Sequence, residues 1–399
     1  MNPGLRRAFW GVMISFFVHG LVVSTWVSRL PSVKAALHLG DGALGMALLG
    51  TAIGSITAIP ICGYLVSRYG SRDTAQWTSM GFCVALVLPA MARDGITLFV
   101  ALFVYGAMAG ANDVAMNAQA VGTERLLGTP SISRFHAMFS LGGIAGSCIG
   151  ALVAAQGIFA PVHLAASATL FLILATSMRP LMADTRQAAQ AKTRVSFRRI
   201  PTTLLVLCAI GFCIFLSEGA LADWTAIYLR QVLGASEGLA PMGYAVFSTA
   251  MAFFRFFGDA LTKRIGRPSM IRFGGLTAAA GLALAVSVRS PYVAMAGFAA
   301  AGAGFSSIIP LVFAAGGRIS NVNEGAGVAT VSGLGYLGFL VGPTAIGLLS
   351  EAISLRAGLA VLVVLSTTAA LLVGVVEKAG GAQANPLADS VEAPEMMVA

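Results

Sequence analysis

The chain has 399 residues, of which 57% are hydrophobic and only 10% are charged. Soluble domains carry about 25% charged residues, so this composition excludes an ordinary soluble protein and indicates an integral membrane protein. The formal net charge is +9, which raises the question of whether the excess serves nucleic-acid binding or membrane topology.

Twelve apolar runs are each long enough to cross a hydrocarbon core of about 30 Å, which requires roughly 20 helical residues. Backbone polar groups in lipid must be paired within one segment, so runs of this length predict helices rather than barrel strands. The sequence therefore predicts an all-α polytopic membrane protein. The runs are centred in 8–28, 43–66, 74–92, 96–119, 133–156, 161–178, 202–228, 240–262, 272–288, 291–316, 325–350 and 357–376.

The basic residues are divided unequally between the two sides of these predicted spans. With both termini in the cytoplasm, eighteen Lys or Arg residues are cytoplasmic, six lie on the opposite side, and Arg255 lies inside a span. This bias follows the positive-inside rule. It predicts a multi-pass protein of the cell (inner) membrane with both termini cytoplasmic, and it accounts for the positive charge without a nucleic-acid partner.

An internal repeat appears when the chain is compared with itself at an offset of 196 residues. Gly70 then coincides with Gly266, and Gly106 with Gly302. The offset predicts two six-helix halves of the same orientation, residues 1–178 and 201–376. The polar segment 179–200 between them is predicted to be a cytoplasmic linker, and 377–399 a disordered cytoplasmic tail.

The loop sequences resemble those of the major facilitator superfamily. GYLVSRYGSR at 63–72 is similar to the family signature between spans two and three, and DALTKRIGR at 259–267 is its counterpart in the second half. The usual aspartate before the first arginine is Ser67 here. The resemblance implies twelve transmembrane helices in two pseudo-symmetric halves, with spans one, four, seven and ten around a central cavity and spans three, six, nine and twelve facing lipid.

Four further segments resemble the sugar-permease branch of that family, which includes fucose permeases. They are NDVAMNAQAV from residue 112, FHAMFSLGG from 135, EGALADWTAIYL from 218 and GYLGFLVGP from 335. This narrower resemblance implies a small sugar-like solute as the substrate.

Ionisable residues inside a bilayer are costly, so each is a candidate functional residue. Asp113 lies on the fourth predicted span, and an acid-bearing face is not expected to face lipid. His136, early in span five, is expected at a similar depth, where it can pair with Asp113 or exchange a proton with it. The amides are equally compatible with simple hydrogen bonds between helices. The predicted substrate-binding or proton-coupling residues of this half are His19, Trp26, Asn112, Asp113, Asn117 and His136.

In the second half, Glu218 is the strongest candidate because it lies near the middle of span seven. Asp223 lies about 140° around that helix, so the two acids are not expected to face one site. Ser306 is predicted to belong to the site, in a span that Pro310 is expected to kink. Arg255 and Asp259, one turn apart, suit an ion pair that holds a gate closed. The predicted gating residues are Arg68, Arg255, Asp259 and Arg264.

These features predict a secondary active transporter that works by alternating access and couples protons to the uptake of a small polar, sugar-like solute. The alternatives are proton-coupled efflux of a metabolite or drug and, from a different class, a transport-inactive receptor or scaffold. The chain contains no GxxxxGK[ST], HExxH or GxSxG motif, so we expect no enzyme activity, no cofactor and no metal. The expected partners are the solute, protons and bilayer lipid, and the expected state is a monomer.

Overall fold

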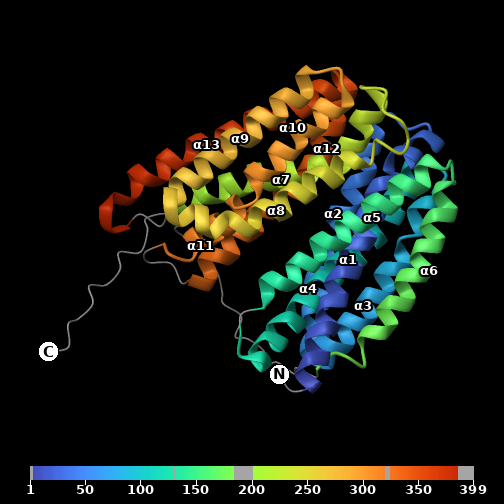
Figure 1. The fold of residues 1–399 in the computed structure, drawn as a ribbon, viewed down its shortest axis with the longest axis horizontal. Coiled ribbons are helices and arrows are strands. Elements are labelled where there is room, and N and C mark those ends of the chain that lie inside the picture. Colours follow the sequence, from blue (N-terminus) through green and yellow to red (C-terminus); the bar gives the residue numbers. More distant parts are fainter. Residues whose placement is uncertain (1–2, 130, 184–200, 320–323, 385–399) are drawn as a thin grey trace.

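The computed structural model describes residues 3–384 with the exception of 130, 184–200 and 320–323. The described chain consists of α-helices and one 3-10 turn, η1 (Leu88–Met91), as Figure 1 shows. The helices are α1 (Pro3–Ala36), α2 (Asp41–Tyr69), α3 (Ser71–Ala85), α4 (Gly95–Leu127), α5 (Ile132–Ala155), α6 (Ala160–Met178), α7 (Thr202–Gln231), α8 (Met242–Ile265), α9 (Arg267–Ser287), α10 (Pro291–Phe305), α11 (Ile308–Gly316), α12 (Glu324–Ala352) and α13 (Leu355–Ala384).

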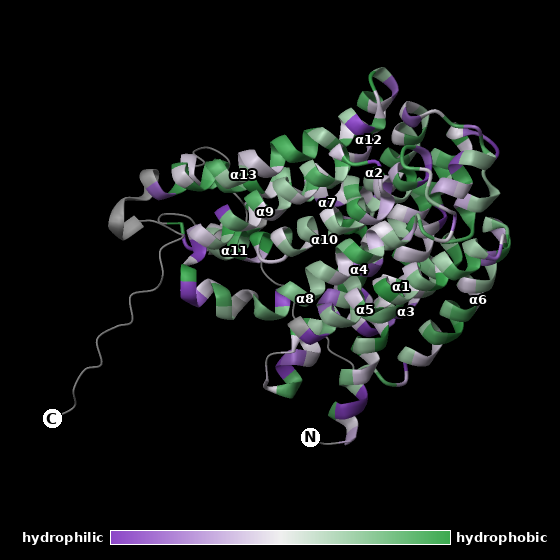
Figure 2. Cartoon of the chain, turned by 45° about the horizontal axis from the view of Figure 1, so that its top comes forward, coloured by the Kyte–Doolittle hydropathy of each residue, from purple (hydrophilic) through white to green (hydrophobic). Residues whose placement is uncertain are grey.

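Eleven segments of the described chain are long and apolar enough to cross a membrane. They confirm eleven of the twelve predicted runs, with α10 and α11 together forming one segment. Helix α8, which corresponds to the run 240–262, is not among the eleven, because the side chain of Asp259 is outside the described residues and the stretch 242–258 before it is too short to count as a span. It nevertheless packs against α5 and α10 within the bundle. Figure 2 shows hydrophobic residues along the helices and hydrophilic residues concentrated near helix ends and loops.

The last helix is longer than predicted. Helix α13 continues to Ala384, so the first residues of the predicted tail, from Glu377, are helical. Arg272 on α9 contacts Glu377 at 2.5 Å, and this ion pair holds that part of α13 against its neighbour. The rest of the predicted tail and most of the predicted linker lie outside the described residues.

Equivalent glycines create the same helix crossing in both halves. A Cβ atom on Gly106 would lie 1.9 Å from the carbonyl oxygen of Thr51, and one on Gly302 would lie 2.2 Å from that of Phe247. Thr51 and Phe247 are themselves separated by the repeat offset of 196. The crossing of α2 with α4 is therefore reproduced by α8 with α10, because only glycine permits backbones to approach so closely.

The loop glycines of the repeat also have one conformation. Gly70 has φ = 88° between α2 and α3, and Gly266 has φ = 80° between α8 and α9. Residues with a Cβ atom rarely adopt these positive values. The two loops that resemble the family signature are thus the same sharp turn, repeated in each half.

The two halves meet on one side of the bundle and diverge on the other. A Cβ atom on Gly45 of α2 would lie 3.0 Å from the Cα atom of Gly347 on α12, so these helices touch near the start of one and the end of the other. We call this side the closed face. The opposite side, where α1 begins and α13 ends, is the terminal face, and in Figure 1 the halves separate toward it.

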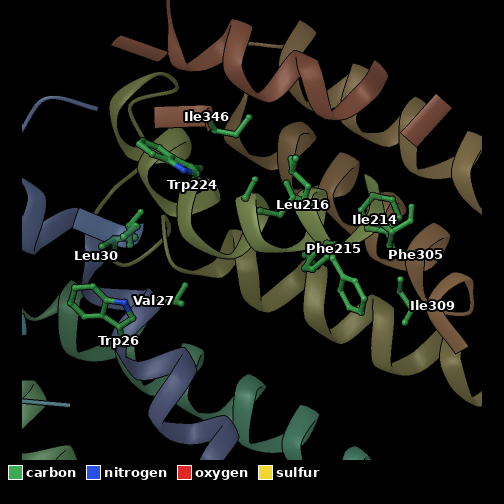
Figure 3. Packing of buried hydrophobic residues seen from close by; sticks show 14 of the residues in the cluster. Trp26, Val27, Leu30, Ile214, Phe215, Leu216, Trp224, Phe305, Ile309 and Ile346 are labelled. Atoms are coloured by element: carbon green, nitrogen blue, oxygen red, sulfur yellow. The ribbon is translucent and has the colours of Figure 1, made fainter. Parts of the chain in front are cut away.

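A buried hydrophobic cluster extends across both halves. Figure 3 shows Trp26 and Leu30 of α1, Trp224 of α7 and Ile346 of α12 within this cluster. The indole Nε1 of Trp224 donates a hydrogen bond of 3.1 Å to the carbonyl oxygen of Pro343. Buried tryptophans usually need such a partner, and this bond fixes α7 against α12.

Candidate functional site

A cavity of about 870 Å³ lies between the two halves. Its lining comes from α1, α2, α4 and α5 of the first half and from α7, α8 and α12 of the second. Among the described residues, α3, α6, α9 and α13 contribute nothing to it, as the family resemblance implied. The tenth span differs from that expectation, because neither α10 nor α11 supplies a lining residue, whereas α2, α5, α8 and α12 do.

Asp113 lines this cavity from the middle of α4. The amide Nδ2 of Asn117, one turn later, donates hydrogen bonds to the Asp113 carboxylate at 3.1 Å and to its backbone carbonyl at 2.9 Å. The predicted pair of an acid and an amide on one helical face is therefore present. It supplies a carboxylate that is oriented by one donor and accessible from the cavity.

Glu218 and Asp223 both line the cavity from α7. The expectation that the two acids face different sites is wrong, because the cavity is wide enough to contact more than 140° of the surface of α7. Asp223 comes five residues after Glu218, which places it about 7.5 Å farther along the helix axis and nearer the closed face. The Oε1 atom of Glu218 is buried and has no hydrogen-bond partner in the described part of the chain.

Aromatic rings form much of the remaining wall. Trp26, a predicted site residue, lines the cavity, and its ring centroid lies 6.2 Å from that of Tyr105. On the opposite wall, the rings of Tyr336 and Phe339 of α12 are stacked, with their centroids 6.0 Å apart. The cavity therefore combines carboxylates with flat apolar surfaces, which are the two features that polar ring-shaped or amphiphilic solutes require.

His19 and Asn112 lie outside the cavity lining and bind each other. Asn112 Nδ2 is 2.9 Å from His19 Nδ1, and Thr78 Oγ1 donates to Asn112 Oδ1 at 3.2 Å. This buried chain joins α1, α4 and α3. Of the two roles considered for the amide, the structure places Asn112 in hydrogen bonding between helices.

His136 is also absent from the cavity lining in this conformation. Its ring contacts Phe16 edge-on, with centroids 5.0 Å apart. No ion pair between His136 and Asp113 within 4.0 Å is present among the described side chains. The expected pairing of these two residues is not observed here.

Ser306 lies at a break between α10 and α11 rather than in the cavity. Its hydroxyl donates to the carbonyl of Ala303 at 2.7 Å. The expected distortion by Pro310 is present: proline has no N–H, so the carbonyl of Ser306, four residues earlier, loses its helical partner. Arg255 Nε on α8 donates to that carbonyl at 3.0 Å.

This arrangement predicts an outcome for a double-mutant cycle. Arg255→Ala leaves the Ser306 carbonyl without its donor, which we expect to destabilise the protein by about 1–3 kcal/mol. In a Pro310→Ala background the helix itself supplies a donor, so the same substitution is expected to cost much less. Thermal unfolding of the purified variants measures both effects. An equal loss in the two backgrounds would contradict this role for Arg255.

The hydrogen bonds that Arg68 and Arg255 form among the described residues stay within one half each. Arg68 donates to the hydroxyl of Tyr64 at 2.8 Å and lies 5.5 Å from the ring centroid of Tyr69, all on α2. Arg264 lies in the last turn of α8 at the terminal face. The side chain of Asp259 is outside the described residues, so its predicted ion pair with Arg255 stays a prediction.

The polar contacts that join the halves lie instead at the closed face. Lys34 of α1, only 4% exposed, forms an ion pair with Asp41 of α2 and donates to Gln231 of α7 at 2.8 Å. The hydroxyl of Ser350 on α12 donates to the same Asp41 carboxylate. We call Lys34, Asp41, Gln231 and Ser350 the closed-face network. The opposite charges flanking the loop between the first two spans were its signal in the sequence.

Two helical halves around a cavity define a class of protein, namely the membrane transporters built from two repeated bundles. The profile of the Major Facilitator Superfamily matches residues 12–316 and again 207–394. An uncharacterized MFS-type transporter of Yersinia pestis is 33% identical over 371 residues, which cover 93% of this chain and 96% of that protein. Membrane protein MosC of Rhizobium meliloti is 32% identical over 359 residues, which cover 89% of this chain and 86% of that protein. The chain belongs to the major facilitator superfamily.

Solved structures share this fold at low sequence identity. The nucleoside transporter NupG matches with a TM-score of 0.73 and 13% identity, covering 94% of this chain and 99% of that one. A bacterial homologue of the human lysosomal transporter Spinster, in an inward-facing and occupied conformation, matches with a TM-score of 0.76 and 16% identity. The match covers 95% of this chain and 98% of that one. A D-xylose-proton symporter matches with a TM-score of 0.71 and 15% identity, covering 92% of this chain and 96% of that one.

Proposed function

We propose that this transporter takes up a small polar, sugar-like solute together with protons by alternating access. The observation that carries the proposal is the cavity between the halves, which presents a carboxylate from the first half, Asp113, and two from the second, Glu218 and Asp223. A carboxylate in a partly dry cavity is costly until it is neutralised or paired. Protonation, solute occupancy and the equilibrium between conformations are thereby linked.

Two kinds of similarity support a hydroxylated solute. The quoted segments resemble sugar permeases, and two of the fold neighbours are a nucleoside transporter and a D-xylose-proton symporter. The aromatic surfaces of Trp26 and Tyr336 suit the apolar face of such a ring. The same aromatic wall favours a second candidate function, proton-coupled efflux of an amphiphilic metabolite or drug.

Proteoliposomes distinguish these functions. The assay uses purified protein, an imposed pH gradient and a panel of labelled sugars and amphiphilic cations. If the function is proton-coupled uptake, the solute should accumulate inside as protons move in the same direction. If the function is proton-coupled efflux, the solute should move in the direction opposite to the protons. Binding without any solute-dependent proton movement would favour the receptor or scaffold and would contradict the proposal.

We further propose that the terminal face is cytoplasmic, that the conformation described is inward-open, and that the protein is a monomer of the inner membrane. The charge bias supports this orientation, because the closed face carries the smaller set of basic residues. The fold neighbour in an inward-facing conformation is consistent with it.

Cysteine labelling tests that orientation. In a variant without native cysteines, a membrane-impermeant thiol reagent added to intact cells should label Ile353→Cys at the closed face, where this residue is 69% exposed. It should not label Thr129→Cys, an exposed residue at the terminal face. Labelling of both after membrane permeabilisation is the control. The reverse pattern in intact cells would overturn the orientation.

A further inference from the structure

The charged residues of the cavity are unbalanced. Its lining includes Asp113, Glu218 and Asp223, whereas Arg255 is the one basic side chain in it within the described part of the chain. Arg255 is already bonded to the Ser306 carbonyl and forms no ion pair within 4.0 Å with these acids. Three carboxylates therefore share one basic side chain, which is less positive charge than buried carboxylates ordinarily require.

The two acids of α7 are less well satisfied than Asp113. Asp113 accepts a hydrogen bond from Asn117. Glu218 has a buried carboxylate oxygen without a partner in the described part of the chain. Asp223 forms no ion pair within 4.0 Å with any described side chain. Both of these acids lie on α7, and Asp223 is the nearer of the two to the closed face.

The surroundings of these two acids favour an organic cation. Three aromatic side chains, Tyr244, Trp26 and Phe339, line the same cavity as the two carboxylates. Aromatic faces attract ammonium groups, and the attraction is strongest at desolvated sites. No group of three His, Cys, Asp or Glu side chains that could hold a metal ion occurs among the described residues, so the lining does not favour a metal ion as the counter-charge.

We propose that the transported solute carries a protonated amine beside its hydroxyl groups, and that Glu218 and Asp223 receive this amine. The proposal rests on the proposed function and specifies its substrate class: amino sugars and related amino polyols rather than neutral sugars. The ammonium group supplies the missing positive charge, and its three N–H donors can be shared between the two carboxylates. Asp113 remains available as the residue that exchanges a proton.

Matched ligands test the charge directly. The probes are glucosamine, galactosamine and mannosamine, each compared with its N-acetyl derivative and its parent sugar. Binding is measured by thermal shift and calorimetry on the purified full-length protein. For at least one of the three, we expect the amine to bind at least about tenfold more tightly than both neutral partners, as charge-assisted hydrogen bonds require. If no amine binds more tightly than its neutral partners, the proposal is overturned.

Variants assign the preference to residues. Glu218→Gln and Asp223→Asn retain shape but remove charge, so each should reduce the ratio of amine to neutral affinity toward one. Asp73→Asn is the matched control, because Asp73 is bonded to Arg179 outside the cavity, and it should leave the ratio unchanged. An unchanged ratio in both α7 variants would contradict the assignment, whether or not their stability falls.

Flux measurements separate this proposal from the proposed function. If a neutral sugar is accumulated with protons and the amines are ignored, the amine proposal fails and proton-coupled uptake stands. If an amine binds with the expected preference but moves no protons, the amine proposal stands and proton-coupled uptake fails.

Discussion

Asp113→Asn is expected to abolish proton-driven accumulation of the solute while exchange of labelled for unlabelled solute continues. Asparagine is close to aspartate in shape and remains neutral at every pH, and its side-chain oxygen can still accept the hydrogen bond from Asn117. Exchange requires the halves to alternate but no net release of a proton. With one proton per solute, the accumulation ratio should fall from about tenfold per pH unit of gradient to one.

Parallel assays in proteoliposomes measure this result. Uptake under an imposed pH gradient reports coupling, and exchange without a gradient reports the conformational cycle. Asp73→Asn again serves as the control, since it neutralises a carboxylate outside the cavity and should retain accumulation. Uphill, proton-driven transport by Asp113→Asn would exclude Asp113 as the coupling residue and leave Glu218 or His136. A simultaneous loss of binding and exchange would mean that the charge itself holds the solute.

Lys34→Met is expected to lower the population of the conformation described here, in which the two halves touch at the closed face. The substitution leaves the Asp41 carboxylate without its counter-charge and Gln231 without its donor. Breaking a buried charge pair that is hydrogen-bonded costs about 2–5 kcal/mol. A destabilisation of about 2 kcal/mol lowers the population of this conformation relative to its alternative by roughly 30-fold.

Distances across the closed face report that shift. Spin labels at Phe159 and Ile353, which are 80% and 69% exposed and belong to opposite halves, should show a longer distance in Lys34→Met. Arg230→Met is the control, because Arg230 pairs with Glu237 on the surface of one half and such pairs contribute about 0–1 kcal/mol. The additional change Asp41→Asn should partly restore the short distance, since it removes the unpaired charge. Distances identical to those of the unmodified protein would refute the network as a lock.

Local sequence alone was sufficient for most of the fold. Hydropathy located eleven spans because a helix in lipid must satisfy its backbone within one apolar segment. The same reasoning placed a run at 240–262, where α8 packs against α5 and α10. It also ended α13 too early, since Glu377 is held by a partner on another helix. The offset of 196 located the repeated crossing and the turn glycines, because these positions tolerate no side chain.

The candidate site was only partly predictable. Asp113 and Glu218 could be found because an acid in an apolar span is rare and costly wherever the helix lies. Whether a polar residue faces the cavity depends on how its helix is rotated and on how wide the cavity is, and helical spacing does not contain that information. His19 and Asn112 therefore proved to bind each other, while Asp223, expected to face elsewhere, lines the cavity beside Glu218.

For this protein, the sequence by itself determined the membrane class, the spans, the repeat and the presence of buried acids, since each follows from the free energy of placing individual residues in lipid. The tertiary structure decided which of those residues share one cavity and which contacts hold the halves together. Ser350 reaches Asp41 from the other end of the chain, and Arg255 reaches a carbonyl that Pro310 left free on a different helix. Such pairings arise only when the helices pack, because their energies belong to contacts between segments and not to either segment alone.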